Sequence, residues 1–366
     1  MKLRAAALAA AMLGVSTIVA LPAAGASVVG RAPVAAAASG AHAAAAARCF
    51  WVDRLALRGS GAAAAIRYWT PARTAATVSF SQANLAKALT SQRSLQAEPP
   101  KPALTRMCLP VSTAVPSHGA DKPPAVPATR AINGYKTVGK FFVRFLHAKF
   151  NCTATVIGRN IIVTAAHCFK GVIGGIKYTT TDWMFAPMWH DNKFPYGKWS
   201  VHSVYLVQSW IKKLNPKFDY AVVILKRRSG HGVGYYTGQD SWNSRLSLAP
   251  RQSRPVRIVG IPATSSKALI SVTRAVSVDV RPRFEVLRAR TPRFGQGTSG
   301  GPWFHPFRTK TGTGTVIGVT GGYQAGGATD SPSYADFLTR HFSDLIAAAI
   351  KGITHCNNTG DCRYWP

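Results

Sequence analysis

A serine among four glycines is the clearest chemical feature of this 366-residue sequence. The stretch reads Gly295-Gln296-Gly297-Thr298-Ser299-Gly300-Gly301-Pro302. Glycine tolerates positive φ and lets other groups approach the backbone closely. A tight turn with bare N–H groups around Ser299 suits an acyl-transfer nucleophile, because the oxyanion of a tetrahedral intermediate must meet donors already in place. The alternative is an ordinary Gly/Ser/Thr surface turn, and residues elsewhere in the chain must decide between the two.

A histidine and an aspartate upstream of this stretch support the chemical interpretation. The β-branched run from Ile161 ends in Ala-Ala-His167-Cys168, and Asp219 stands at the head of a second apolar run that ends at Leu225. The chain order His167, Asp219, Ser299 is one of the orders in which catalytic triads occur. Taken singly, His167 could be a buried structural histidine and Asp219 a turn residue. Their order and flanking residues together favour a triad.

The words around these three residues resemble the motifs of the chymotrypsin-like serine peptidases, in particular their secreted bacterial branch. Thr164-Ala165-Ala166-His167-Cys168 is similar to the histidine motif of that family, and the residues from Gly297 to Pro302 to its serine motif. Asp219-Tyr220-Ala221-Val222 resembles the aspartate motif more loosely. The resemblance covers roughly residues 138–350. It implies a serine endopeptidase that works through an acyl-enzyme, with Ser299 as nucleophile, His167 as base and Asp219 as its orienting partner.

The resemblance also implies how a peptide would bind. The backbone N–H groups of Gly297 and Ser299 would form the oxyanion hole. The strand that ends in Thr320, Gly321 and Gly322 should line the substrate, since its backbone can pair with an extended peptide.

Two positions depart from better-known members of the family. Thr298 replaces the acidic residue that pairs with a new N-terminus in the digestive enzymes, so activation by N-terminal insertion is not expected. Arg293 stands where trypsin has the aspartate of its primary pocket, which does not support cleavage after Lys or Arg. A guanidinium matches a carboxylate, and one hypothesis is a preference for acidic residues, as in glutamyl endopeptidases. Val319, in place of a histidine often used there, argues against it, and Arg293 could equally face solvent.

The rest of the pattern predicts an all-β protein. Short β-rich runs fall into two groups, separated by a connecting region from Gly230 to about Pro250. Such groups suit two packed antiparallel six-stranded β-barrels, the chymotrypsin-like fold, at about residues 131–235 and 250–335. His167 and Asp219 would then lie on barrel one and Ser299 on barrel two. Helical spacing of apolar residues predicts a C-terminal helix at about 334–351. The expected strands are 138–145, 154–157, 161–164, 199–207, 220–225, 256–260, 269–280, 284–290, 302–304 and 315–320.

The N-terminal third is expected to precede the peptidase region, 131–366. A short basic head and a long Ala/Leu/Val stretch predict a signal peptide over residues 1–26, with a retained membrane anchor as the alternative. Residues 27–130 are expected to be a pro-region that ends in a proline-rich linker near Arg130. Within it, a short motif resembles one found in the leader regions of secreted bacterial trypsin-like peptidases: Tyr68-Trp69-Thr70-Pro71-Ala72-Arg73.

The chain has six cysteines, which in an exported protein are expected to form disulfides. The resemblance implies a bridge between Cys152 and Cys168. Cys356 and Cys362 are close enough in sequence to close a C-terminal loop, which would leave Cys49 with Cys108, but the sequence does not fix these pairings. No Cys-x-x-Cys pair occurs and the histidines are scattered, so neither a metal nor a cofactor is expected.

The formal net charge is +32. A surface this basic attracts anionic polymers non-specifically, but the basic residues are dispersed and no nucleic-acid-binding motif occurs. The expected protein is a secreted, monomeric endopeptidase that acts on protein or peptide substrates and keeps no transmembrane segment after signal cleavage. The alternative, from a different functional class, is a catalytically inactive protein that uses the same scaffold to bind the cell wall.

Overall fold

Buried β-branched and aromatic runs form most of the strands. The computed structural model describes residues 48–56, 59–79, 84, 87–88, 104–109, 134–173, 176–246, 253–281, 284–290, 294–327, 332–351, 353–356 and 362–364. The predicted signal peptide lies outside these residues, as do Arg293 and the proline-rich linker apart from residues 104–109.

Barrel one is a ring of six antiparallel strands. The strands follow the order β11-β6-β5-β4-β9-β10, and pairing between β10 and β11 closes the ring. Alternate residues of β4, among them Phe141 and Val143, point into a buried core that contains Trp199 from β10 and Val223 from β11. The strands are β4 (Val138–Phe145), β5 (Ala148–Gly158), β6 (Ile161–Thr164), β9 (Thr181–Pro187), β10 (Trp199–Val207) and β11 (Ala221–Leu225).

Barrel two has the same construction. Its ring runs β17-β16-β13-β14-β15-β18 and closes between β17 and β18. Trp303, Leu287 and Ile258 are buried in its core. The strands are β13 (Ser253–Gly260), β14 (Leu269–Arg281), β15 (Phe284–Ala289), β16 (Pro302–Arg308), β17 (Thr313–Thr320) and β18 (Ser333–Phe337). The two predicted antiparallel six-stranded barrels are therefore present.

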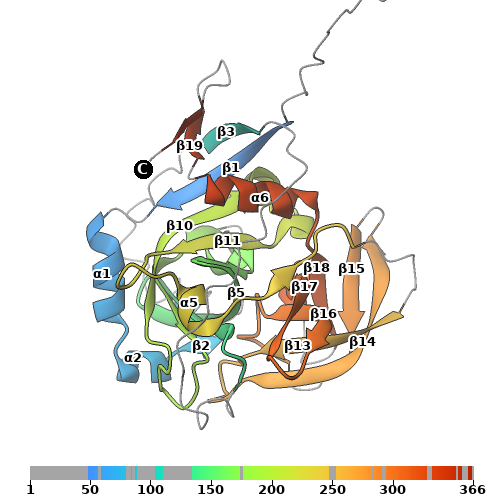
Figure 1. Ribbon diagram of the computed structural model, residues 1–366, viewed down its shortest axis with the longest axis horizontal. Helices are drawn as coiled ribbons and strands as arrows, with labels where there is room; N and C mark the ends of the chain where they lie inside the picture. Colours follow the sequence, from blue (N-terminus) through green and yellow to red (C-terminus); the bar gives the residue numbers. More distant parts are fainter. Residues whose placement is uncertain are drawn as a thin grey trace, which may run out of the picture. The chain divides into compact units, whose positions relative to one another are not determined.

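The C-terminal helix is shorter than predicted. Helix α6 is Arg340–Ile350, and residues 333–337 form β18 instead. The apolar residues from Tyr334 onward fit a helical period, but the first of them pair with β15 and β17 because barrel two needs a sixth strand to close. Helix α6 lies against β10 and β11 (Figure 1). Its residues Phe342, Leu345 and Ile346 are buried.

Parts of the predicted pro-region pack on barrel one. Strand β1 (Arg48–Ala56) pairs with β10 and with β3 (Leu104–Leu109), and β2 (Val78–Ser79) pairs in parallel with β5. Helices α1 (Gly59–Tyr68) and α2 (Pro71–Ala75) follow β1 (Figure 1). Helix α1 contacts β9 and β10. Trp69, between the two helices, is fully buried against Phe142, Met184 and Trp189. These segments thus extend the first sheet.

Short elements complete the connections. They are η2 (Ala166–Cys168), β7 (Lys170–Ile173), β8 (Ile176–Thr179), α4 (Gln208–Lys213), η3 (Pro216–Phe218), α5 (Val233–Thr237), β12 (Ser241–Trp242), η4 (Tyr323–Gly326), β19 (Ile353–Cys356) and β20 (Cys362–Tyr364). The β1–β3 ladder sets Cys49 opposite Cys108, and the β19–β20 ladder sets Cys356 opposite Cys362. Both registers agree with the pairs that the sequence left open.

A buried lysine lies beneath the N-terminal segment. Lys140 is on β4, next to Phe142, and only 1% of its surface is exposed. Its Nζ lies 4.0 Å from the centre of the Trp189 ring, a cation–π contact, and 5.9 Å from that of Phe142. Burial lowers the pKa of the Lys140 ammonium from 10.5 to about 7, because an apolar cluster disfavours the charged form.

We predict that Lys140→Met raises the melting temperature at pH 7 by at least about 2 °C. In a protein of this size, a change of about 1 kcal/mol in the free energy of unfolding shifts the melting temperature by a few degrees. Between pH 7 and 10.5 the unfolded chain binds the proton and the folded chain does not, so wild-type stability gains from Lys140 as pH rises. The difference between wild type and Lys140→Met should therefore shrink over that range. Calorimetry measures it, with the exposed Lys213→Met as control. Equal behaviour of the two variants would contradict the prediction.

Candidate active site

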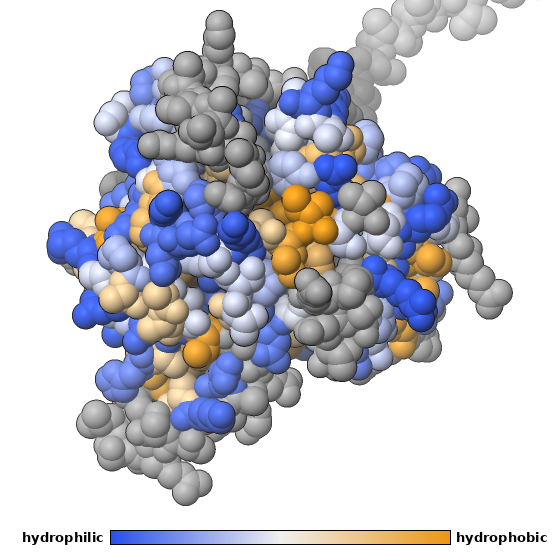
Figure 2. Space-filling view, turned by 90° about the horizontal axis from the view of Figure 1, so that it is seen from below, coloured by the Kyte–Doolittle hydropathy of each residue, from blue (hydrophilic) through white to orange (hydrophobic). Residues whose placement is uncertain are grey.

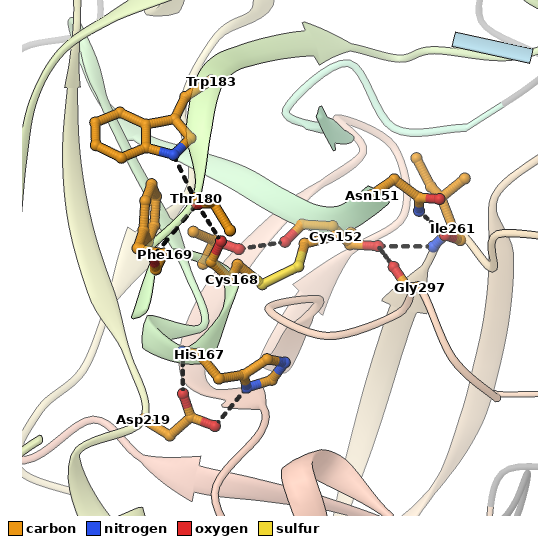
Figure 3. Close-up of a disulfide and its surroundings, with 12 residues drawn as sticks. Asn151, Cys152, His167, Cys168, Phe169, Thr180, Trp183, Asp219, Ile261 and Gly297 are labelled. Carbon is orange, nitrogen blue, oxygen red and sulfur yellow. Dashed lines mark hydrogen bonds and ion pairs between the residues drawn. A yellow bond between two sulfur atoms is a disulfide. The ribbon is translucent and has the colours of Figure 1, made fainter. Parts of the chain in front are cut away.

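Strand pairing brings the predicted histidine and aspartate together. In the ladder between β6 and β11, Thr164 lies opposite Ala221, so the ends of the two strands are adjacent. Helix η2 carries His167 just after β6, and Asp219 comes just before β11. The Nδ1 of His167 lies 2.7 Å from Oδ2 of Asp219, and the backbone N–H of His167 donates to Oδ1 at 2.8 Å (Figure 3). The carboxylate therefore holds both the imidazole ring and the main chain that bears it.

Barrel two supplies a further donor to the same carboxylate. The backbone N–H of Gly322, just after β17, donates to Oδ2 of Asp219 at 2.8 Å. Asp219 is 1% exposed, and a buried carboxylate is stable only where hydrogen bonds replace its water. The three N–H groups meet this need, and they tie the end of β17 to barrel one.

A disulfide and a tyrosine support the helix that carries His167. Cys152 on β5 is bonded to Cys168, as the resemblance implied (Figure 3). The hydroxyl of Tyr178 on β8 donates to the backbone carbonyl of His167 at 2.8 Å. Burial, together with the charge of Asp219, raises the pKa of Tyr178, so this hydroxyl keeps its proton and remains a donor.

The serine loop is bonded to both barrels. The backbone N–H of Thr153 on β5 donates to the carbonyl of Ser299 at 2.8 Å, and the Thr153 hydroxyl donates to that of Gly297 at 3.0 Å. From barrel two, the N–H of Gly300 donates to the carbonyl of Thr320 at 2.7 Å. Gly297 and Gly300 have φ of +98° and +80°, which only glycine adopts without strain. The loop thus requires two of its glycines for conformation.

The two N–H groups predicted to form an oxyanion hole are those of Gly297 and Ser299. Within the part of the chain that the structure describes, neither of them donates to a protein acceptor. Ser299 itself is 6% exposed. The Thr298 hydroxyl between them donates to the carbonyl of Gly295 at 2.7 Å, inside the loop. The N–H groups of Gly297 and Ser299 are therefore able to donate to an oxygen atom that lies beside the serine.

The predicted substrate-binding residues after β17 have internal partners. The hydroxyl of Thr320 accepts the indole N–H of Trp303 at 3.0 Å. The N–H of Gly321 donates to the carbonyl of Tyr334 at 3.2 Å, and that of Gly322 is taken by Asp219. These hydrogen bonds fix the position of the segment from Thr320 to Gly322 next to Asp219.

A cluster of Cys152, His167 and Cys168 has its sulfur and nitrogen atoms within 4.8 Å of one another. The two cysteines are joined to each other, so they offer no thiolate to a metal. The cluster is the disulfide beside the histidine, and it does not constitute a metal site.

Sequence reasoning missed Tyr178 and Asp336 as neighbours of the site. The side chain of Asp336 on β18 accepts the backbone N–H of Asp219 at 3.1 Å. Asp336 comes from a strand that reaches the site only through long-range pairing, whereas Tyr178 lies on the β7–β8 hairpin just after His167. Neither residue has a motif around it. A buried carboxyl needs hydrogen-bond donors, and this requirement could have pointed to Asp336 only once β18 was placed.

Two six-stranded barrels, with a paired histidine and aspartate and a glycine-flanked serine at their junction, define the chymotrypsin-like class of serine peptidases. The chain matches the Trypsin family over residues 132–346, more than half of its length. It therefore belongs to the trypsin family and is a serine-type peptidase, a hydrolase of peptide bonds.

Individual relatives are distant. The protease Anisep from Arthrobacter nicotinovorans is 20% identical, with a TM-score of 0.50 over 59% of this chain and 97% of that one. A thermostable serine protease, AL20, from an extremophilic microorganism is 18% identical, with a TM-score of 0.49 over 58% and 96%. A Bacillus subtilis (strain 168) protein called extracellular metalloprotease is 31% identical over 87 residues, 24% of this chain. That match spans only 27% of the B. subtilis protein.

We predict that Gly300→Ala destabilises the protein more than Gly230→Ala. The two glycines have almost the same φ, +80° and +78°, so both variants bear a similar conformational cost of about 1–2 kcal/mol. An added Cβ at Gly300 would lie 2.1 Å from the Thr164 hydroxyl, whereas at Gly230 it would meet nothing within 4 Å. Thermal unfolding of the two purified variants measures the difference. Equal losses of stability in the two variants would show that the serine loop is not packed closely against β5 and β6.

Proposed function

We propose that this protein is a secreted endopeptidase that cleaves peptide bonds with His167, Asp219 and Ser299 as its catalytic triad. The observation that carries the proposal is the bonding of His167 to Asp219 through both ring and main chain, at distances of 2.7 and 2.8 Å. The bonds from Thr153 to the serine loop support the placement of Ser299 beside this pair.

The first half of the reaction forms the acyl-enzyme. A carboxylate can only accept, so Asp219 holds the His167 tautomer with its proton on Nδ1, and Nε2 carries the lone pair that acts as base. The Ser299 oxygen attacks the peptide carbonyl carbon while Nε2 takes its proton. The carbonyl oxygen becomes an oxyanion, which the N–H groups of Gly297 and Ser299 stabilise. The intermediate collapses, the C–N bond breaks, and the imidazolium gives its proton to the leaving amine.

The second half releases the acid. Water attacks the ester carbon, and Nε2 of His167 takes a proton from it. The new tetrahedral intermediate collapses, and the proton returns to the oxygen of Ser299. Asp219 stabilises the imidazolium in both halves.

The segment from Thr320 to Gly322 would border an extended peptide. The peptide would pair with backbone groups of this segment other than the N–H groups, which are already bonded inside the protein. A preference for acidic residues before the scissile bond depends on Arg293, which lies outside the described residues, and stays a hypothesis.

Export is supported by composition. The basic, alanine-rich start of the chain fits a signal peptide, and a partial relative from B. subtilis is called extracellular. Among the described residues, no helix has the length and hydrophobicity needed to cross a bilayer. Figure 2 shows hydrophilic residues spread over one face and interrupted by apolar patches. The formal net charge of +32 fits non-specific attraction of this protein to anionic polymers.

We predict that maturation removes residues 27–130, so that the mature chain begins near Ala131. The sequence before Arg130 is rich in proline, a composition typical of linkers between domains, where proteases often cut. Because Trp69 covers Phe142 and Trp189, release of the segment should expose an apolar cluster and increase the fluorescence of a hydrophobic dye. N-terminal sequencing of protein from culture medium is the direct measurement. A mature chain that begins near Ser27 would show a retained domain.

We predict that Ser299→Ala, His167→Ala and Asp219→Asn each abolish most peptidase activity and leave the fold intact. The three residues act as one unit, so a double variant should lose little more than a single one. Initial rates on a peptide substrate, with circular dichroism to check folding, measure the effect. Thr298→Ser, which keeps the hydroxyl inside the loop, is the matched control and should remain active. Asp219→Asn within about threefold of wild type would contradict the assignment, because the comparable loss in a known triad is about 10⁴.

A further inference from the structure

A second buried carboxyl lies directly behind the proposed triad. Asp336 is the fourth residue of β18 and is 1% exposed. Its Oδ2 accepts the backbone N–H of Asp219 at 3.1 Å, so it bonds to the main chain of the very residue that orients His167. Its Oδ1 is buried and has no hydrogen-bond partner within the described part of the chain.

Gly322 links the two carboxyl groups. Its N–H donates to Oδ2 of Asp219, and a Cβ added to it would lie 2.0 Å from Oδ1 of Asp336. Asp336 therefore packs against the backbone that also donates to the triad aspartate. A single hydrogen-bonded unit contains Asp219, Gly322 and Asp336, and it joins the start of β11 to the ends of β17 and β18.

The surroundings of Asp336 disfavour a second negative charge. Burial and the nearby charge of Asp219 raise the pKa of Asp336 well above its usual range, against smaller opposing effects from the Asp219 N–H and from Lys217 on η3. Tyr220, just before β11, also interacts with Asp336, and burial raises the pKa of that phenol, so it brings no charge. On β17 the residue paired with Asp336 is Val319. Among the described residues, Lys217 is the cation that acts on Asp336.

We propose that Asp336 is a positioning residue that stays neutral while the enzyme works and fixes Asp219 through its backbone N–H. This inference rests on the proposed triad. A neutral carboxyl supplies the acceptor oxygen without adding a charge beside Asp219. The single negative charge of the pair then remains on Asp219, where it faces the imidazole.

Two substitutions at this position separate the acceptor from the charge. Asp336→Asn keeps an oxygen that can accept the Asp219 N–H and is neutral at every pH. Asp336→Val removes this acceptor and leaves the buried Asp219 N–H with only its longer bond, at 3.3 Å, to the Pro216 carbonyl. If Asp336 is a neutral positioning residue, the first variant should behave as wild type and the second should not.

The experiment is a pH profile of kcat and kcat/KM for the purified enzyme and both variants on one peptide substrate. We expect Asp336→Asn to stay within about threefold of wild type with the same acid limb, since that limb reports the free enzyme's essential base. We expect Asp336→Val to lose at least about tenfold, mainly in kcat, as for an interaction made in the transition state. An acid limb displaced by about half a pH unit or more in Asp336→Asn would show that Asp336 is ionised and would overturn the proposal. Full activity of Asp336→Val would do the same.

A second measurement does not depend on activity. In the Ser299→Ala background, infrared difference spectra with and without Asp336→Asn should show the carbonyl band of a protonated carboxylic acid at neutral pH. Absence of that band would overturn the neutral state of Asp336, even if Asp336→Val failed to fold. Substantial activity in Ser299→Ala alone would instead overturn the proposed function, so the two failures are distinguishable.

Discussion

The site depends on keeping one carboxylate ionised inside the protein. Asp219 is almost fully buried, and an ion removed from water must be solvated by the chain itself. Its solvation comes from the backbone and ring of His167 and from the backbone of Gly322, which belong to different barrels. The bonds that stabilise the charge are therefore also the bonds that hold the two barrels in register at the site. A change that moved either barrel would remove a donor from Asp219.

The strands of the two barrels hold the ends of short loops, and these loops bear the proposed catalytic residues. The register of β6 on β11 fixes where His167 and Asp219 meet, and a disulfide and Tyr178 hold the intervening turn. On the other barrel, the serine loop is bonded to β5 through Thr153 and to β17 through Thr320. A site supported from several strands in this way is preorganised, which is how enzymes stabilise charge that develops during a reaction.

The sequence predicted local features well and long-range ones poorly. Strands β4, β6 and β10 were predicted to the residue, because alternating or continuous β-branched and aromatic runs have a strong local signal. Strand β9, which ends in Pro187, was missed, and the start of the C-terminal helix was wrong because Ser333–Phe337 closes barrel two. Motifs identified the three proposed triad residues. No local pattern could show that Asp336 meets the backbone of Asp219, because that contact exists only after both barrels have closed.

The most direct test of the central claim is covalent labelling with a fluorophosphonate, followed by mass spectrometry of the modified peptide. The account predicts that the label lies on Ser299, because only a serine activated by a neighbouring base reacts readily. His167→Ala should abolish labelling in folded protein. Folded wild-type protein that takes no label, or a label on another residue, would contradict the account.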